Sequence, residues 1–383
     1  MADKFFIPGK IIMGEDALVA GMKQMKSMGD KALIVCGPIV KRIGLTKKIT
    51  DMLEEEKIEY TVFPGITGEP TDTMIDEGVK AYQENKCDFF IGVGGGSPLD
   101  AIKAIAVMVT CGGKMSDYMG VPITQELPKM VAIPTTAGTG SEATQFTIIT
   151  DTKTDVKMLL KGETLMPDLA IIEAELTMTA PKAVTAATGL DALTHAIEAY
   201  TSRKAQPLTD MFALSAIKRI FAYLPAAYLD GTNEKARSEM AMAALEAGIA
   251  FNNSSVTIVH GMSRPIGALF HVPHGVSNAL LLYDCMEYVL EGVLKRFSIL
   301  GKAIKVASEK EEDTVAAQKF LRAIKDICKT CEIGGIKEYG VDKERFIELV
   351  PKMAKDAMIS GSPGNTRMEI DEKDIIEIYR KLV

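Results

Sequence analysis

The chain has 383 residues, enough for two domains, because a single hydrophobic core stops growing near roughly 250–300 residues. A hydrophobic content of 47% with 25% charged residues is that of a globular protein, and a formal net charge of -7 excludes the basic footprint that nucleic-acid binding requires. No basic segment precedes an apolar run at the start, and no run of about 18 apolar residues occurs, so we expect a cytoplasmic protein that does not enter a membrane.

Short apolar runs alternate with helical patterns in the first third of the chain. Residues 5–13, FFIPGKIIM, predict two short strands joined at Pro8-Gly9 as a hairpin or an edge pair. Further strands are expected at 32–36, 60–63 and 89–93, with helices through Met52 and over 71–85. This alternation predicts βαβ units and a parallel sheet.

A glycine run, GGGSP at 94–98, directly follows the third of these strands. Ser97 is a good N-cap, Pro98 suits the first helical position and Asp100 stands where a capping box has its acid, so a helix is predicted to start here and to run to about Val109. Glycines before a helix let backbone N–H groups approach an anion, which the helix dipole favours. The pattern therefore predicts a pyrophosphate site, the alternative being a tight turn.

A second glycine-rich loop, PTTAGTGSE at 134–142, follows the apolar run at 130–133. It offers hydroxyl groups and flexible backbone at the expected carboxyl end of a parallel strand, where ligands of open α/β sheets bind. The two loops together could hold a dinucleotide, with its pyrophosphate on the first and its nicotinamide end near the second. Further strands are predicted at 148–151 and 170–172, with Lys157 between them.

The composition changes at Pro181, after which Ala, Leu, Met and Glu recur with helical periodicity. We therefore predict an α/β dinucleotide-binding domain over residues 1–180 and an all-α metal-binding domain over residues 181–383. Helices are expected at 207–224, 234–251, 276–294 and 371–382. The C-x-x-C at Cys328 and Cys331 lacks a second pair, and we interpret it as two thiols at a helix end.

The only four histidines fall in two stretches of this helical half. Asp191 and His195 are four residues apart and share one face of a helix, while His260 and His274 bracket a segment rich in Gly and Pro; His271 is the fourth. One carboxylate and three imidazoles suit a divalent first-row metal such as Fe or Zn. The alternative for the first pair alone is a satisfied buried ion pair.

Four motifs in this order resemble the iron-dependent (group III) alcohol dehydrogenases, the family that includes lactaldehyde reductase and 1,3-propanediol dehydrogenase. They are GGGSPLDAIKAIA, PTTAGTGSEAT, GLDALTHAIEAY and HGMSRPIGALFHVPHGVSNA, and the resemblance covers nearly the whole chain. It implies a dehydroquinate synthase-like architecture, with a parallel-sheet dinucleotide-binding domain, an all-helical C-terminal domain and a metal in the cleft between them. The implied activity is hydride transfer between NAD(P)H and a short-chain aldehyde or alcohol.

The resemblance also implies roles for individual residues. The implied metal ligands are Asp191, His195, His260 and His274. The implied cofactor site is lined by Gly95, Gly96, Ser97, Asp100, Thr135, Thr136, Thr139 and Lys157. Phe251 matches a position that faces the substrate in relatives.

Gly37 departs from the pattern of relatives that use NAD, which have an Asp at the end of the first βα strand. That carboxylate accepts from the ribose 2′-OH and repels a 2′-phosphate. Gly37 removes the repulsion, and Lys41 or Arg42 could reach the phosphate, so we predict that NADP is accepted and preferred over NAD. The alternative is that Gly37 serves only the turn into Pro38.

Arg264 stands where many relatives carry a histidine that is given a proton-relay role. Its planar guanidinium could bind an anionic group of a substrate, the alternative being a structural ion pair. His271 is the remaining imidazole outside the ligand set, and we expect it on the cleft wall or beside the ligands.

Two other functions are compatible with the architecture. One is a dehydroquinate synthase-like metal lyase, disfavoured by the sparse basic residues near the metal stretches, and the other is a scaffolding or filament-forming relative. We expect a small alcohol or aldehyde as the substrate, Fe as the metal with Zn as the alternative, and a homo-oligomer, a dimer or larger, with the N-terminal strand pair as a plausible interface.

Overall fold

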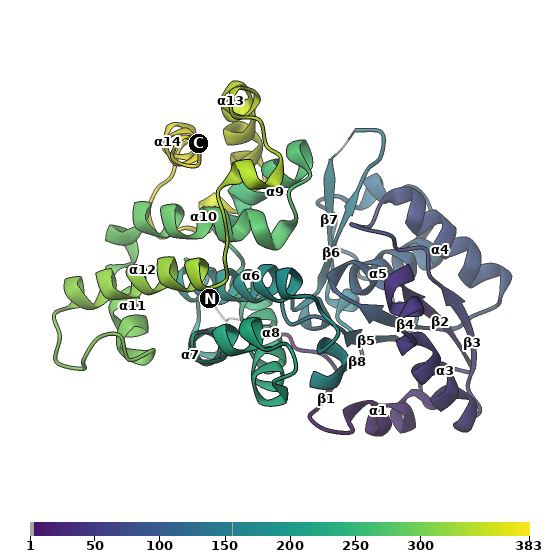
Figure 1. The fold of residues 1–383 in the computed structure, drawn as a ribbon. Helices are drawn as coiled ribbons and strands as arrows, with labels where there is room; N and C mark the ends of the chain where they lie inside the picture. The colour runs from purple at the N-terminus through teal and green to yellow at the C-terminus, as the bar shows by residue number, and fades with distance from the viewer. Residues whose placement is uncertain (1–3, 155) are drawn as a thin grey trace. The chain divides into compact units, whose positions relative to one another are not determined.

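The computed structural model describes residues 4–154 and 156–383, which form two compact units. One unit spans Phe6–Ala180, and the other spans Pro181–Val383 together with residues 4 and 5. The named strands all lie in the first unit and the second is helical (Figure 1). The predicted fold class, a parallel-sheet α/β part followed by a helical part, is thus confirmed.

The first unit is built on a six-stranded parallel sheet with the order β1-β8-β5-β4-β2-β3. Its central strands are continuous apolar runs buried along their whole length, as expected where helices cover both faces of a parallel sheet. The strands are β1 (Lys10–Met13), β2 (Lys31–Cys36), β3 (Glu59–Phe63), β4 (Phe89–Gly94), β5 (Met130–Pro134) and β8 (Leu169–Ile172).

Helices cover both faces of this sheet. α1 (Ala17–Met25) and α3 (Leu45–Glu55) lie on one face, and α4 (Asp72–Glu84) and α5 (Gly96–Cys111) lie on the other (Figure 1). A short helix, α2 (Pro38–Arg42), follows β2. Each face has its own core of buried aliphatic side chains, and each such side chain stabilises the fold by about 1.5–3 kcal/mol.

The predicted N-terminal hairpin is wrong. The chain forms only β1 here, which starts at Lys10 and pairs in parallel with β8 at the edge of the sheet. The backbone N–H groups of Gly9 and Lys10 donate to Pro167 and Asp168, and Pro8 has no N–H to offer a second strand. The expected strand pair is therefore not formed among the described residues, and β1 is a single edge strand beside β8.

A strand that the sequence analysis did not predict begins at Lys157. β7 (Lys157–Lys161) pairs antiparallel with β6 (Phe146–Thr150) in a separate two-stranded ribbon. Its letters KMLLK alternate between buried and more exposed positions, which is the period of a strand with one covered face.

Nine helices longer than eight residues make up the described part of the second unit, and α6 is the most buried of them. Apart from Lys182 at its start, α6 has only Asp191 and Glu198 as charged residues, and an otherwise apolar helix is expected inside a core. Gly189 leaves room for Leu224, which would lie 2.4 Å from a Cβ there. The helices are α6 (Lys182–Thr201), α7 (Pro207–Leu229), α8 (Glu234–Ser254), α9 (Ile258–Phe270), α10 (His274–Tyr288), α11 (Leu290–Ala303), α12 (Asp313–Thr330), α13 (Lys343–Ile359) and α14 (Glu372–Lys381).

The single helix predicted over 276–294 is two helices, α10 and α11. The break falls at Val289, whose φ of -88° and ψ of 5° end one helix and precede the next. A Cβ on Gly292 would lie 3.0 Å from the Cβ of Met368, so the second helix packs closely against the segment before α14. Hydrophobic periodicity continues through the bend and does not mark it.

Among the described helices, α7 is long and apolar enough to cross a membrane, which the sequence analysis did not single out. A core helix of a globular protein meets the same criteria, and α7 packs against α6 and α8. Its Arg219 is paired with Glu239 and with Glu246 of α8, at 3.2 Å from the latter. These contacts hold α7 in the helical unit, and Leu208, Met211 and Leu229 are among its exposed residues.

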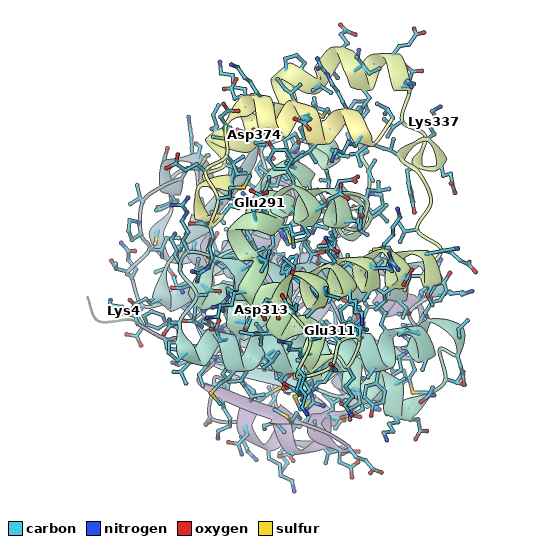
Figure 2. All side chains as sticks on the ribbon, turned by 90° about the vertical axis from the view of Figure 1, so that its left-hand side faces the viewer. Lys4, Glu291, Glu311, Asp313, Lys337 and Asp374 are labelled. Atoms are coloured by element: carbon cyan, nitrogen blue, oxygen red, sulfur yellow. The ribbon has the colours of Figure 1, made fainter. Side chains whose placement is uncertain are left out.

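The charged stretch around Glu311 is a solvated face of the helical unit (Figure 2). Glu311 pairs with Lys319 at 2.5 Å, and Asp313 pairs with Lys302 at 3.2 Å. The six cysteines are all free, and Cys331 caps the end of α12, so the expected thiols at a helix end are confirmed.

Candidate active site

Three acidic or imidazole side chains lie on one face of α6. Asp191, His195 and Glu198 are at positions i, i+4 and i+7, which place them one above another on a helix. They are 1%, 5% and 0% exposed. A buried helix that carries polar groups on only one face needs partners there, since an unpaired buried charge is costly.

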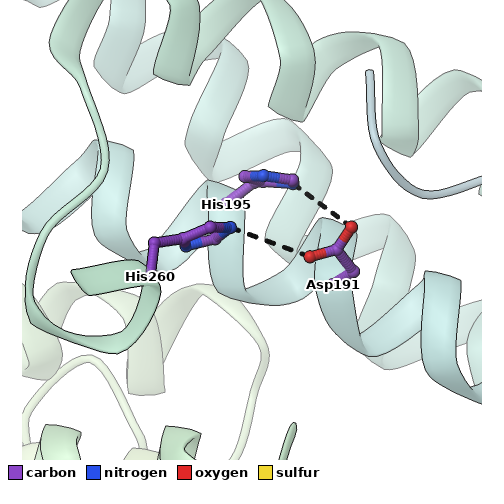
Figure 3. Close-up of side chains that lie close together, drawn as sticks. All are labelled: Asp191, His195 and His260. Atoms are coloured by element: carbon purple, nitrogen blue, oxygen red, sulfur yellow. Dashed lines mark ion pairs between the residues drawn. The ribbon is translucent and has the colours of Figure 1, made fainter. Parts of the chain in front are cut away.

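The partners come from α9 and α10, and the four side chains Asp191, His195, His260 and His274 are called the ligand cluster below. The Asp191 carboxylate lies at its centre, 4.0 Å from Nδ1 of His195 and 3.7 Å from Nε2 of both His260 and His274. Figure 3 shows the carboxylate of Asp191 turned towards the rings of His195 and His260. The structure thus brings the four predicted ligands together within one unit.

The surroundings of Asp191 and His260 favour the protonation states in which these two residues bind a metal. Burial alone would raise the pKa of Asp191, but the three imidazoles and the Asn278 amide outweigh it and hold the pKa below its ordinary value. Burial, with the neighbouring His195, lowers the pKa of His260 well below its ordinary value. An ionised carboxylate beside neutral imidazoles is the form in which both residue types coordinate a metal.

An orphaned nitrogen tests whether the ligand cluster fits a metal. Nδ1 of His195 is buried and has no hydrogen-bond partner among the described residues. One ligand atom each of Asp191, His195 and His260 lie within 4.8 Å of one another. A divalent ion between them would satisfy the orphaned nitrogen, and mixed nitrogen and oxygen ligands suit iron or zinc.

Glu198, which the sequence analysis missed, holds His260 of the ligand cluster in place through hydrogen bonds. Nδ1–H of His260 donates to its Oε2 at 2.5 Å, and the backbone N–H of Val259 donates to its Oε1 at 2.7 Å. The hydroxyl of Thr257 donates to Oε1 as well, at 2.9 Å. The signal that could have found Glu198 is its spacing of three residues from His195 on a helix that is otherwise apolar.

Asn278 is the second residue missed. From α10 its Nδ2 donates to Oδ1 of Asp191 at 2.7 Å and lies 3.1 Å from Nε2 of His260 and 3.2 Å from Nε2 of His274. It stands four residues after His274, the spacing that puts two side chains on the same face of a helix.

Phe251 of α8 lies against the ligand cluster; that it faces the substrate stays a prediction. Its ring stacks on that of His195 with centroids 4.0 Å apart and an interplanar angle of 10°. The His195 ring in turn stacks on His260 at 4.4 Å. This apolar wall keeps water from one side of the cluster.

Arg264 and His271 differ in their relation to the cluster. Nη1 of Arg264 donates to Oγ of Ser362 at 3.0 Å, and burial lowers the pKa of its guanidinium while the charge of Glu198 raises it. His271 is exposed and ends α9 with a left-handed φ of 55°. The contact of Arg264 is thus a hydrogen bond to a hydroxyl, with the charge of Glu198 acting on it, and its role stays a prediction.

In the first unit, the two glycine loops meet at the carboxyl ends of β4 and β5. The N–H of Thr135 donates to the carbonyl of Gly94 at 2.8 Å. A Cβ on Gly96 would lie 2.8 Å from Thr139, and one on Gly95 would lie 3.4 Å from Thr136. The glycines are therefore needed for the close approach of the second loop, which agrees with the predicted nearness of the two loops.

The predicted capping of α5 by Ser97 is wrong. α5 begins at Gly96 with Gly95 as its N-cap, and no side chain caps it. The carboxylate of Asp100 does not reach back to the helix start, because it accepts hydrogen bonds from the hydroxyl of Ser141 and, at 3.1 Å, from the N–H of Ile148. The open N–H groups at the start of α5 remain available to an anion.

Lys157 and Gly37 lie elsewhere in the first unit. Nζ of Lys157, at the start of β7, is 2.9 Å from the carboxylate of Glu69. Gly37 is the N-cap of α2, and Lys41 and Arg42 follow it with exposed side chains.

Two family models together match most of the chain. "Iron-containing alcohol dehydrogenase" matches residues 8–174, and "Fe-containing alcohol dehydrogenase family, C-terminal" matches residues 185–383. The first match covers the two glycine loops and the second covers the ligand cluster.

Individual relatives match over the full length. The NAD-dependent methanol dehydrogenase of Bacillus methanolicus is 36% identical over 363 residues, which cover 94% of this chain and 95% of that protein. The 1,3-propanediol dehydrogenase of Citrobacter freundii is 36% identical over 384 residues, which cover 98% of each. The crystal structure of a 1,3-propanediol oxidoreductase has a TM-score of 0.96 and 34% identity, and the alignment covers 100% of both chains.

Proposed function

We propose that this chain, which belongs to the iron-containing alcohol dehydrogenase family and is an NAD(P)-linked alcohol/aldehyde oxidoreductase, holds its divalent metal on the ligand cluster. The observation that carries this proposal is the buried Asp191 carboxylate with three imidazoles around it, one of which has an unpaired nitrogen. Carboxylate and imidazole suit both iron and zinc, and we place iron first because the family is iron-containing.

The chain's own residues orient and shield the reaction. A bound divalent ion would act as a Lewis acid on the substrate oxygen while hydride passes between the substrate carbon and the nicotinamide. Glu198 holds His260 in the tautomer whose Nε2 faces Asp191. Phe251 excludes water beside His195. Because the charge on oxygen is stabilised in this way, no strong protein base is needed.

We assign the dinucleotide to the two glycine loops of the first unit. The pyrophosphate lies at the start of α5, where Gly95, Gly96 and Ser97 present backbone N–H groups, and the nicotinamide end lies near Thr135, Thr136 and Thr139. We assign Asp100 to this site through its hydrogen bond with Ser141 of the second glycine loop. Lys157, which forms an ion pair with Glu69, is assigned to the same site. Anions bind at helix N-termini because the N–H groups and the helix dipole both favour negative charge.

NADP is the proposed preferred cofactor. Gly37 offers no carboxylate to repel a 2′-phosphate, and Lys41 and Arg42 are exposed within one helical turn of it. A Cβ at Gly37 would lie 2.9 Å from the carbonyl oxygen of Ile66, so the glycine also serves packing there.

A short-chain aldehyde or alcohol is the proposed substrate, in the cytoplasm and without nucleic acid or membrane as partner. The net charge of -7 supports the exclusion of nucleic acid. We also propose a homo-oligomer, for which β1 at the edge of the sheet offers unpaired backbone groups. The matches of both family models favour this dehydrogenase over a lyase or a scaffold.

The test is a steady-state screen of neutral and anionic short aldehydes with NADPH and NADH, on iron-loaded and zinc-loaded protein, with and without a chelator. We expect chelator-sensitive oxidation of NADPH with at least one neutral aldehyde. Full activity after complete removal of the metal would overturn the assignment of the ligand cluster, and a strong preference for NADH would overturn the role of Gly37.

A further inference from the structure

A fully buried lysine on α5 is not explained by the proposed chemistry. Lys103 is 0% exposed, and its Nζ donates to oxygens of the segment that follows the second glycine loop. The acceptors are the carbonyl of Ser141 at 2.7 Å, its hydroxyl at 3.2 Å, the carbonyl of Thr144 at 2.9 Å, its hydroxyl at 2.8 Å and the carbonyl of Phe146 at 3.1 Å.

This arrangement is a cation held in a cage of oxygens rather than an ion pair. Asp100 and Glu142 are the charged groups that act on Lys103, yet neither carboxylate is among its hydrogen-bond acceptors. Desolvation of an ammonium group costs stability, and burial lowers the pKa of Lys103 to about 8 against the opposing effect of these two acids. A lysine buried at such a cost needs a reason beyond packing.

The caged segment is continuous with the second glycine loop. The N–H of Ser141 donates to the hydroxyl of Thr139 at 3.3 Å, and Thr139 packs against Gly96 at the start of α5. Ser141 also donates to Asp100, one turn before Lys103 on the same helix. Asp100 and Lys103 therefore hold the chain just after the loop, while the loop itself closes on the first glycine run.

We propose that Lys103 is a positioning residue of the cofactor site, whose ammonium gathers the carbonyls of residues 141–146 and so holds the second glycine loop against the N-terminus of α5. The inference rests on the proposed binding of the dinucleotide by the two loops. Without the cation, the converging carbonyl dipoles repel one another and lose the ammonium group that they share, and the loop moves away from the glycine run.

The expected effect is on cofactor binding more than on turnover. In Lys103→Met, which keeps the length of the side chain, the dissociation constant for NADPH is expected to rise about tenfold or more, since a loosened site loses affinity in this way. Turnover at saturating NADPH is expected to stay within about threefold of the wild type, because the ligand cluster is untouched. Lys103→Ala leaves room for a free amine, so added n-propylammonium is expected to restore part of the NADPH affinity.

The control is a buried cation of the other unit. Arg237 is 3% exposed and donates to the carbonyl of Gly231 at 2.9 Å and to the hydroxyl of Thr185 at 2.8 Å. Arg237→Met removes a buried charge in the same way, and it is expected to lower the melting temperature while leaving the NADPH dissociation constant unchanged.

The measurement is NADPH binding to the full-length, metal-loaded protein by quenching of reduced-nicotinamide fluorescence, beside steady-state kinetics. Unchanged NADPH affinity in Lys103→Met would overturn the inference. An equal rise of the NADPH dissociation constant in Arg237→Met, together with no rescue of Lys103→Ala by n-propylammonium, would also overturn it. If Lys103→Met does not fold, Thr144→Val decides, because it removes a single hydroxyl, which accepts from Nζ of Lys103 at 2.8 Å and donates to the carbonyl of Ser141 at 3.2 Å. About threefold weaker NADPH binding supports the inference, and unchanged binding overturns it. Failure of the wild type to bind NADPH or NADH would instead refute the proposed function.

Discussion

Glu198 and His260 share a hydrogen bond of 2.5 Å, in which Nδ1–H of the imidazole donates to the carboxylate. This bond fixes the ring so that Nε2 faces Asp191. Carboxylates that hold metal-binding histidines in this way raise the basicity of the ring and set its tautomer.

Glu198→Gln is therefore expected to weaken metal binding by about 10–100-fold, the usual cost of losing such a partner. The measurement is competition for iron or zinc against a chelator of known affinity. Glu246→Gln is the matched control, since Glu246 is a carboxylate of α8 that accepts from Ser215 at 2.9 Å. Equal metal affinity in Glu198→Gln and wild type would contradict the supporting role.

His260→Ala is expected to abolish activity and to leave the fold largely intact. A ligand of the cluster is lost, while the packing of α9 depends on its apolar residues. Bound metal and circular dichroism are measured together. His271→Ala is the control, because His271 is exposed at the end of α9, and it is expected to keep its metal. An active, metal-free His260→Ala enzyme would sink the proposed chemistry.

Cofactor preference is expected to follow Gly37 and the basic residues after it. Replacing both Lys41 and Arg42 by alanine removes positive charge near the proposed 2′-phosphate, so kcat/KM for NADPH is expected to fall about tenfold with little change for NADH. The ratio of the two kcat/KM values is the measurement, and a double variant that keeps its NADPH preference would argue against this site.

Arg264→Ala separates two roles of the guanidinium. Its hydrogen bond to Ser362 and the nearby charge of Glu198 predict a structural role, so activity on neutral and acidic aldehydes is expected to fall by the same factor. A loss confined to acidic aldehydes would show instead that Arg264 binds an anionic substrate group.

Glu142 gives the first unit a pH-dependent stability. Burial raises the pKa of its carboxyl to about 7 from an ordinary 4.5, although a backbone hydrogen bond and Lys103 oppose the shift. The folded state thus binds the proton more tightly than the unfolded state. The contribution to the free energy of unfolding is fully present below the unfolded pKa, and it is lost as pH rises through about 7, on the order of 3 kcal/mol in all.

Hydrogen exchange over residues 141–148 measures this effect. Protection is expected to fall between pH 5 and pH 7, beyond the intrinsic pH dependence of exchange, in the wild type but not in Glu142→Gln. The same corrected slope in both proteins would assign the pH dependence to another group.

The inner strands of the parallel sheet and both glycine loops were predictable because buried parallel strands are short apolar runs that end in punctuating residues. The start of α5 was not. Ser97 has the right chemistry for a cap, but Asp100 is held by Ser141 and by Ile148 of β6. Both lie more than forty residues away, where local patterns do not reach. Tertiary contacts there outweigh local propensity.

The ligand set was predictable from rare residues, since the chain has only four histidines. Its support was harder to predict. Glu198 is one of many glutamates, and only its place on an otherwise apolar helix distinguishes it. Asn278 required knowledge of how α10 packs on α6, which no spacing within the sequence supplies.

The ligand cluster joins α6 with α9 and α10. Along the chain, α7 and α8 lie between α6 and α9. An ion held there acts as a cross-link that closes a long loop, and its binding free energy adds to the stability of the helical unit alone. Loss of the ion is therefore expected to loosen the helical unit as well as to stop catalysis, and limited proteolysis with and without a chelator measures the loosening.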